Sequence, residues 1–288
     1  MPVTQALFAS LADGLLLGFV YGLAAMGLTL IFGVIGVVNL SHGALMTVGM
    51  FAAFLLFSAL HLHPYLALPL LAVSGALLGG LLYSAAIHPI LEAPPLSSLL
   101  STFAINMIII GAGTAVFTST PRNIDVTLGA VQAGSVQVLG TRLVAALASV
   151  LFTAGLYLFL YRTRTGKSIR AVANNRIAAE LVGLASTRYL AMSFGLGSLL
   201  AVVSGGLIAT LFPFTIFTGA SYQLKSFVIA VLGGLGNPTG ALVGGLVLGL
   251  IEGVIPMVLP VGWTPVIEFS VFVLMILVRP GGLLGGRR

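Results

Sequence analysis

The sequence predicts an all-α, polytopic membrane protein with about nine transmembrane helices (eight to ten). Hydrophobic residues make up 59% of the 288 positions and charged residues only 6%, whereas an average soluble domain carries about 25% charged residues. The apolar residues also form runs of about 20, the length that a helix needs to cross a bilayer about 30 Å thick. The 37 glycines agree with this class, because small residues let membrane helices pack closely.

The same composition excludes several other classes. There is no cysteine, so disulfides and thiolate metal sites are excluded, and the four histidines are scattered without carboxylates at ligand spacing, so no metal site is expected. A pI near 10.1 reflects few acids and one basic segment, and we expect no nucleic-acid partner. The N-terminal residues carry Asp13 and no Lys or Arg, so the first apolar run is interpreted as a retained span rather than a cleaved signal.

Five spans are predicted in the first half of the chain. The first, Gln5–Ile31, carries Gly14, Gly18 and Gly22 four residues apart, which predicts one smooth packing stripe. The polar stretch Pro121–Gly140 contains an alternating segment, Val126–Leu139, that predicts a short β-hairpin. The other four spans are Ala44–Leu60, Tyr65–Ile87, Leu99–Thr118 and Leu143–Tyr161.

A basic segment, Arg162–Arg188, divides the chain. It holds six of the twelve Lys and Arg residues and a single acid, Glu180. Placing each cation at mid-membrane costs about 2.5–3.5 kcal/mol, so the segment must lie in water, and its positive charge predicts the cytoplasmic side. The expected organisation is a single transmembrane domain (1–288) with N-terminal helices (1–161), a cytoplasmic loop (162–188) and C-terminal helices (189–288).

Four apolar runs follow the basic segment: Tyr189–Phe212, Leu224–Leu235, Ala241–Leu259 and Pro265–Val278. The second and the last are short enough to be re-entrant, which would reduce the count to eight. The tail carries Arg279, Arg287 and Arg288 and is predicted to be a second cytoplasmic anchor. Counting crossings from these two anchors places the N-terminus outside and the C-terminus inside.

A polar cluster interrupts the apolar sequence at Phe32–Gly43. Its members Asn39, Ser41 and His42 are candidates for a substrate pathway or gate, because non-helical backbone inside a membrane is tolerated only against protein or a water-filled cavity. The alternative is that Asn39 or Ser41 only caps the second span. Asn237 and Thr239, in the similar stretch Gly236–Leu242, are candidates for the same pathway.

Three acids lie inside apolar runs: Asp13, Glu252 and Glu268. Such residues usually handle protons or substrate. The predicted crossing direction of each span places all three toward its outer end, which favours outer-vestibule or interfacial roles over proton coupling at the midplane, with Glu252 as the first candidate for an exception.

The basic segment predicts an amphipathic helix. Ile169, Val172, Ala173, Ile177 and Leu181 recur at spacings of three and four, with Arg170, Asn174 and Arg176 on the wet side. It is either a topological anchor or a docking helix for a cytoplasmic partner. Gly166–Ser168 is not a phosphate-binding loop. The position of the first glycine in that motif holds Tyr161, and a membrane span rather than a strand precedes it. We therefore expect no nucleotide bound by this chain.

Four stretches resemble a known family. Residues 170–184 contain Arg170–Ala173, Ala178–Glu180 and Gly183–Leu184, an alanine-rich helix ending in glycine that is similar to the coupling segment of ABC importer permeases. The other three stretches, Phe32–Met50, Leu232–Glu252 and Leu277–Gly285, resemble signatures of branched-chain amino acid permeases of the LivH type. They are spread over the chain in the family's order.

The resemblance implies a fold like that of type II ABC importer permeases, in a bacterial inner membrane. It implies a LivM-type second permease, two cytoplasmic ATPase subunits that use ATP and Mg, and a periplasmic binding protein. It also implies ATPase coupling through Ile169–Gly183, with Arg170, Ala173, Ala179, Glu180 and Gly183 as the contact residues. The implied solute is a branched-chain or other neutral amino acid; related permeases serve urea, amides or aromatic and carboxylic compounds.

Two other functions stay open from the residues. A self-sufficient secondary carrier would explain the polar cluster and the acids but not the basic segment. An intramembrane enzyme using Ser41 and His42 is disfavoured, because adjacent helical residues point about 100° apart. No catalytic residue is therefore expected, and whether the permease pairs with itself or with a second chain stays open.

Overall fold

The computed structural model describes residues 3–133, 136–279 and 281–284 and confirms the all-α, multi-span prediction. Eight helical segments in this part of the chain are long and apolar enough to cross a membrane: Gln5–Ile35, His42–Leu60, Pro64–Ile90, Pro95–Phe117, Gly140–Arg162, Ser186–Ala209, Pro238–Val258 and Val261–Val278. Eight is the lower end of the predicted range. The expected span Leu224–Leu235 corresponds to a helix of 16 residues, which is too short to cross unaided.

The elements are, in chain order, α1 (Val3–Ile35), α2 (His42–Leu60), α3 (Pro64–Leu82), a π-helical turn (Tyr83–Ile87), a short 3-10 turn (His88–Ile90), α4 (Pro95–Phe117), β1 (Ala130–Ala133), β2 (Val136–Leu139), α5 (Gly140–Arg162), α6 (Arg164–Asn174), α7 (Arg176–Leu181), α8 (Ser186–Ala209), α9 (Thr218–Gly233), α10 (Pro238–Val258), a 3-10 turn (Val261–Trp263) and α11 (Thr264–Val278).

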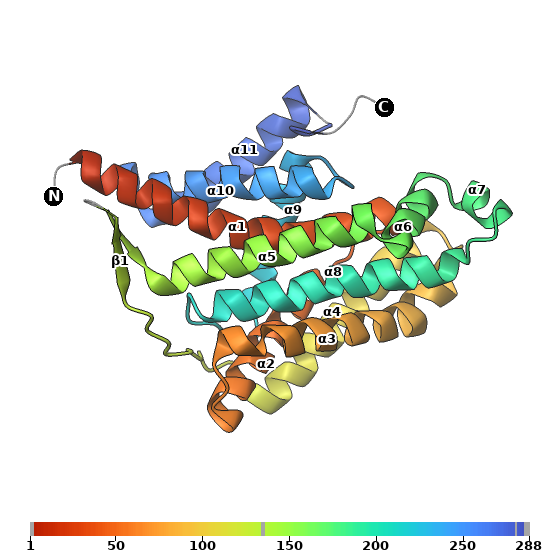
Figure 1. Cartoon of the computed structure of the whole chain (residues 1–288), viewed down its shortest axis with the longest axis horizontal. Helices are drawn as coiled ribbons and strands as arrows, with labels where there is room; N and C mark the ends of the chain where they lie inside the picture. Colours follow the sequence, from red (N-terminus) through yellow and green to blue (C-terminus); the bar gives the residue numbers. More distant parts are fainter. Residues whose placement is uncertain (1–2, 134–135, 280, 285–288) are drawn as a thin grey trace.

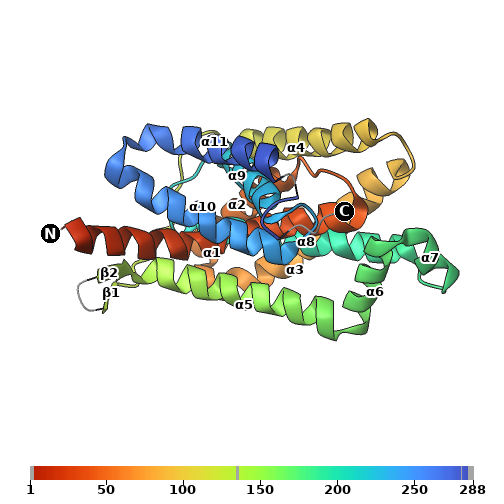
Figure 2. The ribbon, with the colours of Figure 1, turned by 90° about the horizontal axis from the view of Figure 1, so that it is seen from above.

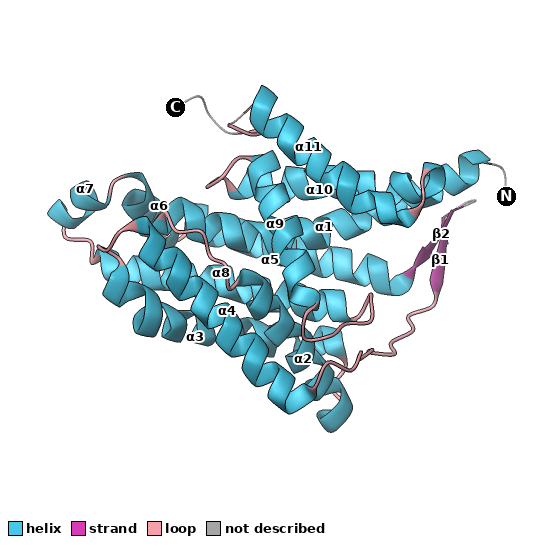
Figure 3. Cartoon of the chain, turned by 180° about the vertical axis from the view of Figure 1, so that it is seen from behind, coloured by secondary structure: helices cyan, strands magenta, loops and turns pink. Residues whose placement is uncertain are grey.

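The long helices lie roughly side by side along the longest axis of the molecule (Figures 1 and 2). The β1–β2 hairpin and the start of α1 lie at one end, which we call the hairpin end, and α6 and α7 lie at the other, which we call the elbow end. Seen from behind in Figure 3, strands occur only at the hairpin end of the described chain. The predicted outside and cytoplasmic sides correspond to these two ends, and this orientation stays a prediction.

Helices α1 and α10 pack through glycines, and this confirms the predicted stripe. Gly14, Gly18 and Gly22 of α1 face a second glycine series in the antiparallel helix α10, Gly245, Gly249 and Gly253. A Cβ on Gly18 would lie 2.9 Å from the carbonyl oxygen of Gly245, which is closer than real side chains approach. The two backbones therefore touch with no room for a side chain between them.

Helix α8 is the most buried element, and α2 and α3 pack against it. A Cβ added to Gly49 of α2 would meet the carbonyl oxygen of Val202, and one added to Gly205 of α8 would meet that of Met46. Small residues again set the helix separation, as expected where lipid supplies no hydrophobic force between helices.

The predicted hairpin in Val126–Leu139 is confirmed. Strands β1 and β2 pair antiparallel, with Ala130 opposite Leu139. Nearby, Arg122 and Phe214 exchange two backbone hydrogen bonds of 2.8 and 2.9 Å. The polar stretch is thereby fastened to the chain between α8 and α9.

The first interruption is shorter than predicted. Helix α1 continues through Phe32 to Ile35, and only residues 36–41 are non-helical. Gly33 packs on the backbone of Gly236, so tertiary contact supports the last turn of α1. The helix ends at Ile35, and the next residue, Gly36, has a φ of +78° that suits glycine.

Candidate functional site

The non-helical segment between α1 and α2, residues 36–41, runs from an exposed Gly36 to buried residues within the bundle; we call it the break. Asn39, Ser41 and His42 are all fully buried. The Oδ1 atom of Asn39 accepts hydrogen bonds from the backbone N–H of Ser41 (3.0 Å) and from its hydroxyl (2.6 Å). Asn39 therefore closes a local turn, while Ser41 makes no side-chain capping bond to α2.

Two residues that the sequence reasoning missed complete the break. Gln223 of α9 donates from Nε2 to the Asn39 carbonyl (3.2 Å) and accepts at Oε1 from the Gly43 N–H (2.5 Å). Thr102 of α4 accepts at Oγ1 from the Leu40 N–H (3.2 Å). Backbone polar groups freed inside a membrane need such partners. Both lie among other polar residues, Gln223 between Ser221 and Lys225 and Thr102 beside Ser101, so neither stood out in the sequence.

His42 and Ser41 do not form a nucleophile–base pair. The Ser41 hydroxyl donates to Asn39, and neither ring nitrogen of His42 has a hydrogen-bond partner among the residues that the structure describes. The His42 ring packs instead against α1, where Cε1 would lie 3.2 Å from a Cβ on Gly27.

Asn237 and Thr239 lie apart from the break, at the start of α10. The Asn237 Oδ1 atom accepts from the Gly240 N–H (3.2 Å) and caps the helix, and Nδ2 donates to the Leu284 carbonyl (3.0 Å). Thr239 Oγ1 lies 3.4 Å from the hydroxyl of Tyr157 on α5. Their pathway role stays a prediction; the contacts present fasten the C-terminal segment to α10. The predicted anchor residues Arg287 and Arg288 lie outside the described residues.

A polar cavity of about 470 Å³ lies toward the hairpin end. Asp13 of α1, Glu252 of α10 and Glu268 of α11 all line it, together with Arg142 of α5 and Lys225 of α9. The three acids, which come from three different predicted spans, are thus brought into one site, and we call the five side chains the ion cluster.

The acids and bases of the ion cluster form ion pairs. Arg142 Nη1 lies 2.6 Å from Asp13 Oδ2. Lys225 Nζ lies 2.8 Å from Glu252 Oε2 and 3.5 Å from Glu268 Oε1. The Lys225 ammonium also lies 5.0 Å from the centre of the Tyr21 ring, a cation–π distance.

The sequence reasoning missed Lys225 and Arg142. Lys225 stands inside the apolar run Leu224–Leu235, and a cation in such a position is by default functional or paired. Arg142 directly precedes the predicted span that begins at Leu143, so its position did not mark it as a cation within an apolar run.

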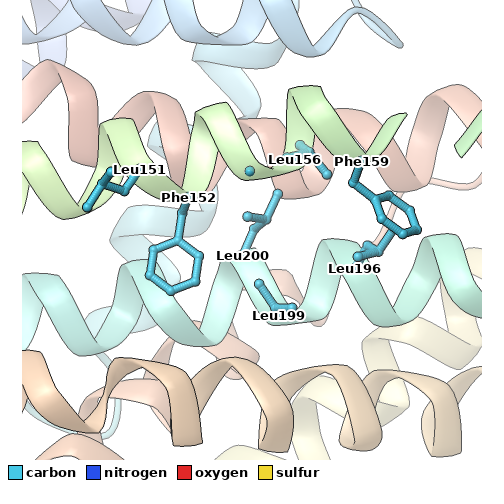
Figure 4. A pocket seen from close by; sticks show the side chains of 8 residues that line it. Leu151, Phe152, Leu156, Phe159, Leu196, Leu199 and Leu200 are labelled. Atoms are coloured by element: carbon cyan, nitrogen blue, oxygen red, sulfur yellow. The ribbon is translucent and has the colours of Figure 1, made fainter. Parts of the chain in front are cut away.

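A second cavity, of about 390 Å³, lies between α5 and α8. Figure 4 shows leucine and phenylalanine side chains of both helices pointing into it. Its lining offers no charged group and no polar side chain to a solute. It therefore suits a lipid chain or an apolar helix face, and the ion cluster is the better candidate for a polar ligand.

Helix α6 at the elbow end is amphipathic, as predicted. Ile169 and Val172 are buried. Thr163 caps the helix by accepting from the Gly166 N–H (3.0 Å). Arg170 is half-buried rather than wholly in solvent: its guanidinium lies 4.2 Å from the Tyr161 ring centre, and Nε donates to the Leu160 carbonyl (3.1 Å). Arg170 thus fastens α6 to the end of α5.

The prediction of one continuous apolar stripe from Ile169 to Leu181 is wrong. The helix ends at Asn174, and Asn175 starts α7 by accepting from the Ala178 N–H (3.0 Å). This change of direction leaves Ile177, Leu181 and Val182 about three-quarters or more exposed, at 73%, 83% and 77%. Ala173 is half-buried and Ala179 buried.

Helix α7 is fastened to α8 by Glu180. This carboxylate accepts from the Ser186 hydroxyl and from Arg176 Nε (3.2 Å), and these hydrogen bonds lower the Glu180 pKa. Gly183 ends the helix with φ +86°, and the N–H groups of Gly183 and Leu184 bond to Glu180 and Ala179 carbonyls. This is a Schellman motif, which favours glycine.

Comparison with known proteins places these features in a family context. Residues 10–278 match the model of the family described as "Branched-chain amino acid transport system / permease component". The permease protein LivH of Salmonella typhimurium, of a high-affinity branched-chain amino acid transport system, is 29% identical, covering 95% of this chain and 94% of the relative. The corresponding protein BraD of Pseudomonas aeruginosa is 28% identical, covering 99% and 98%. No solved structure matches the chain.

Proposed function

Because this chain belongs to the family of branched-chain amino acid transport permease components, we propose that it is the membrane-spanning permease subunit of an ATP-driven importer for branched-chain amino acids. The chain is a multi-pass membrane protein, and the proposed location is a bacterial inner membrane. The relatives LivH and BraD are named as permease proteins of such amino acid transport systems. The proposal extends that role to this chain.

The coupling part of the proposal rests on the exposed apolar surface of α7 and the residue after it, at the elbow end. Ile177, Leu181 and Val182 present it at the elbow end, and a contiguous exposed apolar surface on the cytoplasmic side would mark a protein-interaction site. We define these three residues as the docking face. An ATPase subunit that covers the docking face would bury them, with a gain of about 25 cal/mol per Å² of apolar area.

Helices α6 and α7 at the elbow end are also connected firmly to the spanning helices. Helix α6 contacts α1, α5 and α8, and α7 contacts α8. Arg170 ties α6 to the end of α5, and Glu180 ties α7 to Ser186 at the start of α8. A displacement of the docking face would therefore move spanning helices rather than bend a loose loop.

The remaining partners follow from the proposed role. ATP and Mg are used by two cytoplasmic ATPase subunits and not by this chain, a LivM-type second permease completes the membrane domain, and a periplasmic binding protein delivers solute. The short helix α9 reaches the break through Gln223, and helices that cross only part of the membrane mark solute pathways in many transporters. Asn39, Ser41 and His42 are accordingly proposed at the gate.

The alternative solutes are urea, amides, and aromatic or carboxylic compounds, which related permeases carry. A secondary carrier is the competing mechanism. Uptake of radiolabelled leucine into proteoliposomes separates these possibilities: it should require the ATPase subunits and ATP, and flux driven by ion gradients in the chain alone would favour the carrier.

The coupling is tested by Leu181→Asp, which places a charge in the docking face. We expect the ATPase subunits to dissociate from the purified permease and ATP-driven uptake to fall at least tenfold. Leu128→Asp makes the same change at an exposed leucine of the hairpin end and should leave both unchanged. Retention of ATPase binding and uptake by Leu181→Asp would remove the coupling role from the docking face.

A further inference from the structure

The ion cluster contains one more carboxylate than it has cations. Asp13 is opposed by Arg142, whereas Lys225 is shared between Glu252 and Glu268. The three acids and two bases line the same cavity. With all five groups ionised the site carries a net negative charge, which would be costly in a membrane bundle without a further positive group.

Glu268 is the carboxylate with the weakest pairing. Its residue is only 4% exposed, and its Oε1 atom has no hydrogen-bond partner among the described residues. Lys225 lies 3.5 Å from that oxygen, compared with 2.8 Å from Glu252. A buried carboxylate oxygen that lines a cavity and has only one long ion-pair contact can accept a hydrogen bond from a ligand donor.

We propose that Glu268 binds the ammonium group of the transported solute and so selects for compounds that carry a primary amine. This inference rests on the proposed transport function and names the chemistry that the cavity recognises. A solute ammonium would donate to Glu268 Oε1 and neutralise the excess charge of the cluster. Lys225 would stay paired with Glu252.

Lys225 supplies the complementary group for a zwitterion. Its ammonium has three N–H donors and is held by Glu252 at one of them. Once a solute ammonium occupies Glu268, a second donor of Lys225 is available for the solute carboxylate. Placing the two charged ends of an amino acid between Glu268 and Lys225 satisfies both groups.

The cavity has room for such a solute. Its volume of about 470 Å³ falls within the range of roughly 300–1,000 Å³ that is typical of small-molecule sites. Phe212, Leu17 and Pro256 add apolar surface to the lining. These side chains suit an aliphatic group, whereas a purely anionic compound would meet the incompletely paired carboxylate of Glu268.

The test removes the charge of Glu268 while keeping its shape. Glu268→Gln is compared with wild type in the importer assembled with its partner subunits in nanodiscs, without the binding protein. The probes are 3-methylbutylamine, which has the ammonium but no carboxylate, and 4-methylpentanoate, which has the reverse. We expect binding of the amine to weaken at least tenfold in Glu268→Gln, with binding of the carboxylate unweakened.

Leucine uptake and thermal unfolding complete the test. In proteoliposomes supplied with the binding protein and ATP, Glu268→Gln should lower leucine uptake at least tenfold, without lowering the unfolding temperature, because it removes an excess charge. The control Glu92→Gln, at an exposed glutamate outside the cavity, should alter neither uptake nor amine binding.

The outcomes separate this inference from the proposed function. Unchanged amine binding and leucine uptake in Glu268→Gln would overturn the inference, and so would a large drop in unfolding temperature, which marks a structural partner of Lys225. A wild-type importer that fails to transport leucine would instead refute the proposed solute, while the binding comparison would still decide whether Glu268 holds an ammonium group.

Discussion

The glycine contact between α1 and α10 gives a sharp quantitative prediction. A Cβ on Gly249 would lie 2.5 Å from the Cα and 2.6 Å from the N of Gly18, and would also overlap the Gly14 carbonyl oxygen. These are backbone atoms and cannot rotate away as a side chain could. Gly249→Ala must therefore push the two helices apart.

The magnitude follows from a matched glycine. Gly111 of α4 is exposed, and a Cβ there meets no atom within 4 Å, so Gly111→Ala should stabilise its helix by about 0.5–1 kcal/mol. Gly249→Ala gains the same helical preference but adds an overpacking cost of about 1–3 kcal/mol. The difference in unfolding free energy between the two variants therefore isolates the overpacking cost.

Both variants are compared with wild type by denaturant titration of the purified permease in detergent, followed by circular dichroism. We expect Gly249→Ala to be less stable than Gly111→Ala by about 1–3 kcal/mol. Equal stabilities would refute the packing of α1 on α10 through their glycines.

Three further predictions concern the elbow. Gly183→Val should destabilise the end of α7, because a branched residue at φ +86° costs more than the roughly 1–2 kcal/mol of an ordinary one, and faster trypsin cleavage at Arg176 would report it; unchanged cleavage would contradict the Schellman motif. Arg170→Met should lower ATP-driven uptake several-fold while the ATPase subunits stay bound, because α6 loses its tie to α5; full uptake would contradict this. Because the pKa of Glu180 is lowered, the stability that its hydrogen bonds contribute is fully present above the ordinary glutamate pKa of 4.5 and is lost as pH falls through the lower, folded-state pKa. The ratio of α7 hydrogen-exchange rates between wild type and Glu180→Gln should therefore stay constant between pH 5 and 8. A change of this ratio within that window would refute the assignment.

Long apolar runs were sufficient to predict the spanning helices, because a membrane helix satisfies its own backbone and depends mainly on length and hydrophobicity. The glycine spacing in α1 and the alternation before Leu139 likewise carried the stripe and the hairpin, because each is a local pattern. Helix α9 was harder, because its short length is compensated by contacts with α1, α2 and α10 that come from distant parts of the chain.

The candidate site divides in the same way. The sequence identified the acids because a carboxylate in an apolar run is conspicuous, but it could not show that Asp13 and Glu268 line one cavity, since they lie on the first and last helices. The sequence predicted one apolar stripe running past Asn175, because apolar spacing alone cannot show that the Asn175 side chain starts a new helix. Gln223 and Lys225 escaped notice because their roles depend on partners far away in the sequence.

Helix α9 carries Gln223 and Lys225 only two residues apart, one bonded to the break and the other to the ion cluster. A short rigid rod cannot slide or turn at one of these anchors while staying still at the other. If a solute at Glu268 shifts α9 through Lys225, we expect the Gln223 bonds to the Asn39 turn to change as well. We therefore expect solute binding in the cavity at the hairpin end and the conformation of the break to be coupled directly through helix α9.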